Sequence, residues 1–184
     1  MTTAVILAAG TGARFGGQKL LASVDGIPML ALVLHAVSHL PIVVVAGPDL
    51  SHAVGANVRF IENTAPDRGM AHSLRLAHAA TSEGDALLVL LADMPYMTTA
   101  IVDTILAAAG SADICYPIRD GVGGHPVYFS RAARAKIPSL PDGDTLKLLR
   151  DDPSLAIVRI ELADDGAYRD VDTRADLTEN PKAP

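Results

Sequence analysis

The stretch VILAAGTGARFGGQKLL, residues 5–21, decides how the rest of this 184-residue chain is interpreted. An apolar run ends at Gly10, and a glycine-rich segment with two cations, Arg14 and Lys19, follows it. In an open α/β sheet, ligands bind at the carboxyl ends of the strands. The backbone N–H groups of a glycine-rich loop can surround phosphates there, and cations can neutralise them. The stretch therefore predicts a phosphate site directly after a strand.

Two well-known phosphate loops do not fit this segment. A Walker loop requires Gly-Lys followed by Ser or Thr, but Gln18 precedes Lys19 here, and Leu20 stands in place of the metal-binding hydroxyl. The dinucleotide fingerprint requires a small residue at its third glycine position, which Phe15 occupies. The segment is therefore either a different kind of phosphate cradle or a glycine-rich surface turn with two solvated cations.

Short apolar runs alternate with longer amphipathic ones along the chain. Runs rich in Val and Ile predict strands at 3–8, 42–46, 58–61, 86–91, 114–116, 127–129 and 156–161. The amphipathic runs predict helices at 29–40, 70–80, 98–109, 131–137, 145–150 and 173–178. This alternation is typical of a single α/β domain with a mostly parallel, Rossmann-like sheet and helices on both faces. We expect the domain to span residues 1–180 and residues 181–184 to form a frayed tail.

The composition excludes several classes of protein. Hydrophobic residues make up 49% of the chain, which is typical of a folded domain, and no apolar run has the length of a membrane span. The net charge of −6, without a basic stripe, argues against binding to nucleic acid. The single cysteine, Cys115, excludes an internal disulfide and a Cys-rich zinc site. With no secretory signal at residues 1–10, a reducing cytoplasm is the expected location.

Four further motifs follow the loop in order. They are Gly69-Met70-Ala71-His72-Ser73-Leu74-Arg75, Leu91-Ala92-Asp93-Met94-Pro95, Gly124-His125-Pro126-Val127 and Asp170-Val171-Asp172-Thr173. With the loop, this series resembles the nucleotidyltransferases that act on molybdenum cofactor and related small phosphates. Wider kin of that family transfer nucleotides to sugar phosphates and methylerythritol phosphate. The resemblance implies the fold of the nucleotide-diphospho-sugar transferases.

The resemblance also implies roles for individual residues. The residues that it assigns to nucleotide binding are Leu7, Ala8, Ala9, Gly10, Arg14, Lys19, Gly69 and Ser73. Lys19, Arg14 and Asp93 are the implied catalytic residues, the two cations binding the triphosphate and the leaving pyrophosphate. CTP is the implied donor, a molybdopterin-type phosphate is the implied acceptor, and a client molybdoenzyme is a candidate partner.

Three aspartates are candidates for a Mg²⁺ site. An ionised carboxylate at the end of an apolar strand gains nothing from packing, so we interpret Asp93 as a metal ligand. A second carboxylate must come from Asp170 or Asp172, which strand alternation would place on the same side. The sequence does not choose between them. His125 is a candidate for contact with the acceptor, and a structural hydrogen bond to a loop carbonyl is its alternative role.

The identity of the acceptor stays open at this point. Many cofactor-directed members of the resembled family carry G-D-x-G-A-R where this chain has Gly143-Asp144-Thr145-Leu146-Lys147. One alternative function is therefore cytidylyl or other nucleotidyl transfer to a sugar phosphate or to methylerythritol phosphate. A second alternative is a non-catalytic carrier of molybdenum cofactor. The loop cations and the carboxylates count against the carrier, because a carrier has no pyrophosphate to bind.

Overall fold

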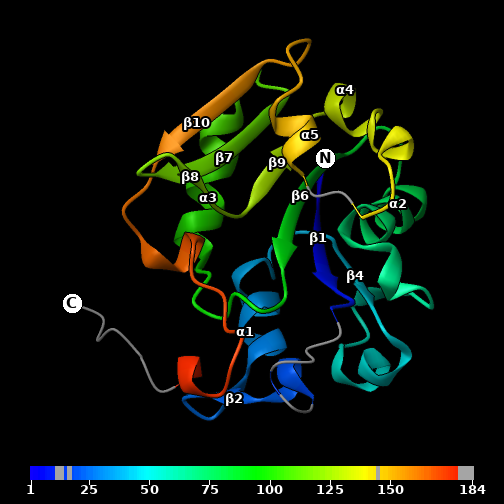
Figure 1. Ribbon diagram of the computed structural model, residues 1–184, viewed down its shortest axis with the longest axis vertical. Helices are drawn as coiled ribbons and strands as arrows, with labels where there is room; N and C mark the ends of the chain where they lie inside the picture. Colours follow the sequence, from blue (N-terminus) through cyan, green and yellow to red (C-terminus); the bar gives the residue numbers. More distant parts are fainter. Residues whose placement is uncertain (11–14, 16–17, 144–145, 178–184) are drawn as a thin grey trace.

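The computed structural model describes residues 1–10, 15, 18–143 and 146–177. Its centre is an eight-stranded sheet in the order β10-β7-β9-β6-β1-β4-β5, with β8 paired to β7 (Figure 1). The strands are β1 (Thr2–Ala8), β4 (Ile42–Ala46), β5 (Val58–Glu62), β6 (Ala86–Leu91), β7 (Ile114–Arg119), β8 (Val122–Gly123), β9 (Val127–Phe129) and β10 (Ile157–Glu161). Along this path only β9 is antiparallel to its neighbours. The predicted α/β domain with a mostly parallel sheet is confirmed.

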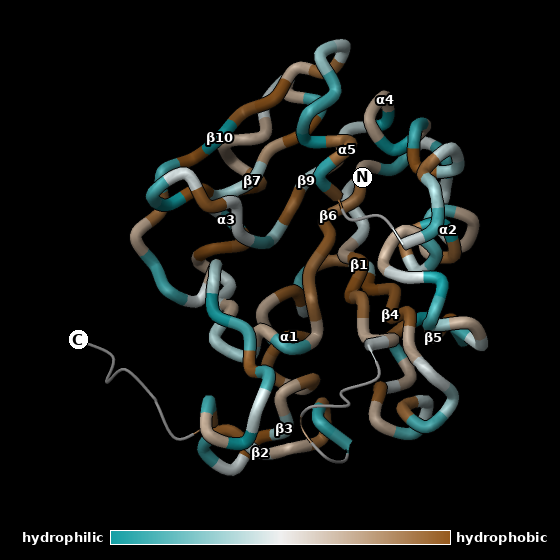
Figure 2. The backbone as a smooth tube through the Cα atoms, in the orientation of Figure 1, coloured by the Kyte–Doolittle hydropathy of each residue, from teal (hydrophilic) through white to brown (hydrophobic). Residues whose placement is uncertain are grey.

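Helices cover both faces of the sheet. They are α1 (Met29–Ala36), α2 (Met70–Ala80), α3 (Thr99–Ala109), α4 (Arg131–Arg134) and α5 (Lys147–Arg150). Alternate residues of β1 separate the two layers: Ala4 and Ile6 pack in the core that contains α1 and α3, and Val5 and Leu7 pack in the core that contains α2, α4 and α5. The central strands β1, β4 and β6 are hydrophobic along their length (Figure 2), as strands buried on both faces must be.

A small hairpin lies outside the main sheet. It pairs β2 (Ser23–Val24) with β3 (Ile27–Pro28), and the turn residues Asp25 and Gly26 both have positive φ. An Asp-Gly pair favours this turn because both positions require a left-handed backbone. The 3₁₀ helix Lys19–Leu21 comes directly before the hairpin and carries Lys19 toward the sheet.

Several helices differ from their predicted ranges. The helix predicted at 29–40 ends at Ala36, ahead of Pro41, and the one predicted at 131–137 stops at Arg134 because Pro138 cannot continue it. The helix predicted at 173–178 is, within the described part, the 3₁₀ helix Ala175–Leu177. By contrast, α2 spans 70–80 as predicted, and α3 begins one residue after its N-cap, Thr98.

The segment after β10 returns across the carboxyl end of β6 and the amino end of β9. It contains the 3₁₀ helix Asp165–Ala167, whose last carbonyl accepts a hydrogen bond from His125 N at 2.8 Å. A Cβ on Gly124 would lie 2.3 Å from the same carbonyl oxygen, so only glycine permits this crossing. Val171 N then donates to Asp93 O at 2.9 Å. The crossing brings the C-terminal aspartates to the end of β6.

No helix in the described ranges is long and apolar enough to cross a membrane. Residues 181–184, predicted as a frayed tail, lie outside the described residues.

Candidate active site

Three charged side chains meet at the carboxyl ends of β1 and β6. Lys19 Nζ lies 3.0 Å from Asp93 Oδ2 and 3.0 Å from Asp172 Oδ1. The three residues come from the 3₁₀ helix after the glycine-rich segment, from the turn after β6 and from the crossing segment. The sequence motifs that carry Lys19, Asp93 and Asp172 are therefore parts of one site.

Hydrogen bonds position the backbone at Asp93 and at Asp172. Ala92 N donates to Leu7 O at 3.0 Å, which holds the start of the Asp93 turn against β1. On the other side, the Asp176 carboxylate accepts from Asp172 N at 2.9 Å and from Thr173 N at 2.6 Å. Side-chain capture of these backbone groups favours a local turn at 172–176. The fold thus positions the backbone at both aspartates, and Lys19 contacts their carboxylates.

The electrostatics of the site keep Lys19 protonated. Only 10% of the Lys19 side chain is exposed, and this burial lowers its pKa. The hydrogen bonds to Asp93 and Asp172, together with their charges, outweigh the burial and leave the pKa of Lys19 above its ordinary value. The three groups carry a net charge of about −1, which suits a cationic or metal-bound ligand.

The structure distinguishes the two C-terminal aspartates by position. Asp172 faces Asp93 across Lys19, whereas Asp170 is exposed. The expectation that strand alternation puts both on one side does not apply, because residues 170–172 form no strand. Over the described ranges, no group of three or more His, Cys, Asp or Glu side chains could hold a metal ion. Two carboxylates are the set that Mg²⁺ accepts when substrate phosphates and waters complete its shell.

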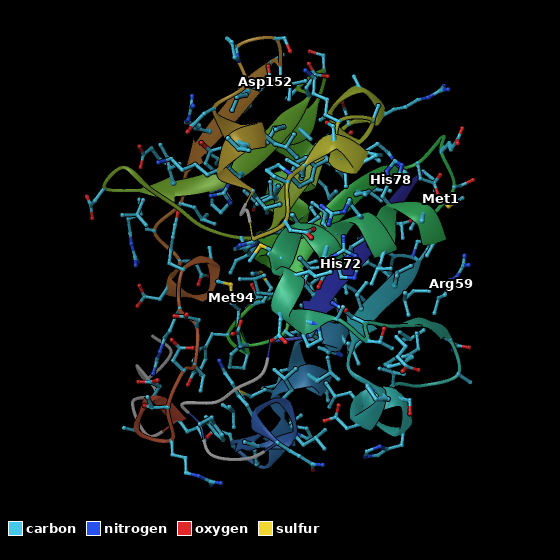
Figure 3. All side chains as sticks on the ribbon, turned by 45° about the vertical axis from the view of Figure 1, so that its right-hand side comes forward. Met1, Arg59, His72, His78, Met94 and Asp152 are labelled. Atoms are coloured by element: carbon cyan, nitrogen blue, oxygen red, sulfur yellow. The ribbon has the colours of Figure 1, made fainter. Side chains whose placement is uncertain are left out.

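Two cavities adjoin the charged cluster. The larger, of about 530 Å³, lies between the end of β1 and the segments that follow β4 and β5. The smaller, of about 220 Å³, lies between the end of β6 and the start of α2. The smaller cavity lies between the first turn of α2 and the turn at Asp93. In Figure 3, the label of His72 marks that turn of α2, and the label of Met94 marks the turn after Asp93.

These cavities bring together the described residues predicted to bind nucleotide. Those lining one or both cavities are Leu7, Ala8, Ala9, Gly10, Lys19, Gly69 and Ser73. Arg14 lies outside the described residues, so its predicted role as the second loop cation stays a prediction.

Asn63 belongs to the site but was not predicted. It follows β5, lines the larger cavity and is only 1% exposed. Its amide donates to Ser73 Oγ at 2.9 Å, and its carbonyl oxygen accepts from Ala65 N at 2.9 Å. Asn63 therefore ties the turn after β5 to α2 and orients the Ser73 hydroxyl. In a sequence, a single Asn after a strand cannot be distinguished from an ordinary turn residue. The one feature that could have indicated a role for Asn63 is its position at the carboxyl end of β5.

A further cavity, of about 520 Å³, lies beyond Met70, which also lines the cavity beside Asp93. Its walls come from the β7–β8 hairpin, α5 and β10, and His125 lies in it. The guanidinium of Arg150 stacks 4.3 Å from the centre of the Tyr116 ring, and Arg150 Nη2 donates to Gly124 O at 2.9 Å. Arg159 Nε donates to Tyr116 Oη at 2.9 Å. With Lys147 also in its wall, the cavity presents, among its described lining residues, three cations and one carboxylate, Asp151.

His125 is neutral in this environment. Burial and the neighbouring charge of Arg150 lower the pKa of His125 to about 4, against the opposing effect of its hydrogen bond with Val89 O. His125 Nδ1 lies 3.3 Å from Val89 O, so its other ring nitrogen is the one that can accept a hydrogen bond. The sequence suggested a loop carbonyl as the structural partner of His125, whereas the partner in the structure is the carbonyl of Val89 in β6. The ring also borders a cavity, so its contact with an acceptor stays a prediction.

Lys19, Asp93 and Asp172 lie at the carboxyl ends of the strands, where α/β enzymes bind their ligands, and the family of the chain makes it a nucleotidyltransferase. The chain belongs to the MobA-like NTP transferase domain family, whose model matches residues 4–155. No curated protein matches the chain.

Solved structures with low sequence identity share the fold. Rv0371c from Mycobacterium tuberculosis H37Rv aligns with a TM-score of 0.83 at 22% identity, covering 95% of this chain and 94% of that chain. Its complex with manganese aligns with a TM-score of 0.71 at 21% identity, covering 88% of this chain and 87% of that chain. Molybdopterin-guanine dinucleotide biosynthesis protein A from Archaeoglobus fulgidus aligns with a TM-score of 0.69 at 19% identity, covering 96% and 95%. The 2-C-methyl-D-erythritol 4-phosphate cytidylyltransferase from Thermus thermophilus aligns with a TM-score of 0.70 at 19% identity, covering 96% of this chain and 96% of that chain.

Proposed function

We propose that this protein transfers CMP from CTP to the phosphate of a molybdopterin-type cofactor and releases pyrophosphate. The observation that carries the proposal is the cluster of Lys19, Asp93 and Asp172 beside the two cavities at the end of β1. An oxygen of the acceptor phosphate attacks the α-phosphorus of CTP in line, and the bond from that phosphorus to the pyrophosphate oxygen breaks. Because the attacking phosphate is already an anion, the reaction needs positioning and charge neutralisation more than a strong general base.

Asp93 and Asp172 are the residues that would hold a divalent cation, and we propose Mg²⁺. Their hard oxygen atoms and partial exposure, 29% and 34%, fit a cation that also needs phosphate and water ligands. The complex of Rv0371C with manganese supports a divalent cation on this fold. Such an ion supplies neutralisation of the negative charge that develops on the transferred phosphate. Lys19 would bind the triphosphate, and Asn63 and Ser73 would orient the nucleoside.

The cationic cavity beyond Met70 is our proposed site for the acceptor. It adjoins the cavity of Asp93, so an acceptor held there can reach the nucleotide. Arg150 and Arg159 favour an anionic ligand, and the neutral His125 can accept a hydrogen bond from it. The Archaeoglobus fulgidus relative, named for molybdopterin-guanine dinucleotide biosynthesis, supports the molybdopterin class. The Thermus thermophilus relative, which acts on methylerythritol phosphate, keeps that phosphate as the runner-up.

The proposed setting is a reducing cytoplasm, where the product can pass to a client molybdoenzyme. The free thiol of Cys115 suits that compartment. Burial raises the pKa of Cys115 to about 11, so this thiol is inert there.

Pyrophosphate release tests the function. Purified protein with Mg²⁺, CTP and molybdopterin should release pyrophosphate, and Asp93→Asn should reduce the rate by about a hundredfold or more. Asp103→Asn is the matched control, because Asp103 is 61% exposed on α3, where it pairs with His39. Binding of molybdopterin without pyrophosphate release would instead show a carrier. If pyrophosphate were released faster with methylerythritol phosphate than with molybdopterin, methylerythritol phosphate would be the acceptor.

A further inference from the structure

The ammonium group of Lys19 occupies the position between the two proposed metal ligands. It lies 3.0 Å from one oxygen of Asp93 and 3.0 Å from one oxygen of Asp172, so it bridges carboxylates that are far apart in sequence. Two carboxylates this close repel each other unless a cation lies between them. In this structure, Lys19 is that cation.

A divalent ion shared by the same two carboxylates would compete with Lys19. Lys19 Nζ lies 3.0 Å from an oxygen of each aspartate, so Asp93 and Asp172 could share an ion only if Nζ moved away from them. Two cations at such a short separation repel strongly in a partly buried site. The ammonium group and the metal therefore exclude each other from this bridging position.

The ammonium group of Lys19 has space to move away from the aspartates. Its side chain borders both the cavity of about 530 Å³ at the end of β1 and a small cavity of about 50 Å³ beside Asp93. The four-carbon stem of lysine is flexible, and its ammonium is a strong partner for phosphate. A triphosphate in the larger cavity can thus draw the ammonium away from the aspartates.

We propose that Lys19 is a positioning residue that holds Asp93 and Asp172 together until the nucleotide arrives, and that it must leave them before the metal binds. This inference rests on the proposed function, because it takes the two aspartates as the metal ligands. It adds an order to the reaction: the metal binds weakly to the free protein and enters with the triphosphate. A lysine that bound only phosphate would leave the metal affinity of the free protein unchanged.

Titration with Mn²⁺, followed by the loss of the free-ion electron paramagnetic resonance signal, tests this order without measuring turnover. In the absence of nucleotide, Lys19→Met and Lys19→Gln should bind Mn²⁺ at least about tenfold more tightly than the wild type. Lys136→Met is the matched control, because Lys136 pairs with Asp152 at 2.7 Å away from the site, and it should leave the Mn²⁺ affinity unchanged. Thermal unfolding of each variant confirms that it is folded.

Two further titrations locate the effect. Adding Asp172→Asn to Lys19→Met should abolish the gain in affinity, and a non-hydrolysable CTP analogue should raise the Mn²⁺ affinity of the wild type toward that of Lys19→Met. Equal or weaker Mn²⁺ binding by both folded Lys19 variants would overturn the inference. Pyrophosphate release is measured separately, so failure of the proposed reaction is distinguishable from failure of the metal exchange.

Discussion

A Cβ atom on Gly69 would lie 2.8 Å from the Cα of Gly143, so the backbones of these two glycines are in direct contact. Gly143 N donates to Arg68 O at 2.8 Å, and the Asp142 carboxylate pairs with both Arg68 and Arg75. Hydrogen bonds and charge from these arginines, Arg68 foremost, lower the pKa of Asp142. The segment before α5 is therefore fastened to the start of α2, next to Ser73.

Gly69→Ala should destabilise the protein, because Gly69 has φ of +83° and a side chain there would collide with backbone. We expect the free energy of unfolding to fall by about 1–3 kcal/mol, measured by urea denaturation. Gly84→Ala is the control: its Cβ would meet nothing within 4 Å, and we expect a change of less than about 0.5 kcal/mol. An unchanged unfolding free energy in Gly69→Ala would show that the two segments do not touch.

Arg150→Met should weaken acceptor binding selectively. The change removes the donor to Gly124 O and the positive charge stacked on Tyr116, so an anionic acceptor loses its partner. We expect the KM for the acceptor to rise about tenfold or more while the KM for CTP changes less than about twofold. Arg150→Lys should recover part of the loss. If only the KM for CTP rose, this cavity would not be the binding site of the acceptor.

The stability of the protein should depend on pH through His125. Its pKa is about 4 in the folded protein and near 6.5 when unfolded, so between these values the unfolded state binds more protons. The free energy of unfolding should therefore fall as the pH drops from 6.5 toward 4, by up to about 1.4 kcal/mol per pH unit. Urea denaturation of the wild type and of His125→Asn across pH 4.5–7 isolates this contribution. Parallel curves for the two proteins would contradict it.

CTP should be preferred over GTP as donor. Ala9 lines both nucleotide cavities, and its methyl group leaves less room for a purine than glycine would. Shape exclusion of this kind is worth about 1–3 kcal/mol, so we expect a preference of roughly tenfold to two-hundredfold. Competition between the two nucleotides at equal concentration measures it, and Ala9→Gly should shift incorporation toward GTP. Equal use of both nucleotides by the wild type would exclude the cytidylyl assignment.

Local patterns in the sequence were sufficient to predict most of the sheet. The continuous apolar runs of β4 and β6 mark strands buried on both faces, and the glycine-rich loop marks the ligand edge. The direction of β9 could not be predicted, because three residues show the same alternation whichever way the strand runs. Its antiparallel pairing depends on where the chain turns at 124–126.

The site was predictable only where a motif lies on its own strand end. Asp93 follows β6 and Lys19 follows the loop after β1, so their places at the strand ends could be inferred from the sequence, while their roles stay predictions. The choice of Asp172 over Asp170 depends on the crossing segment, which is held by hydrogen bonds to distant backbone atoms. In the sequence, Arg150 has the pattern of an ordinary residue of an amphipathic helix. Only the fold shows that Tyr116 of β7 packs against its guanidinium. Contacts of this kind are set by tertiary structure, which periodicity does not report.

The hydrogen bond from Val171 to Asp93 has a consequence for how the protein is made. A ribosome completes β1, α2 and β6 early, yet the partner carboxylate of Asp93 emerges only after β10 has been synthesised. A nascent chain can thus form the nucleotide half of the sheet while Lys19 still has a single aspartate to pair with. We expect a break in the crossing segment to leave β1, β4 and β6 paired and to separate Asp172 from Lys19.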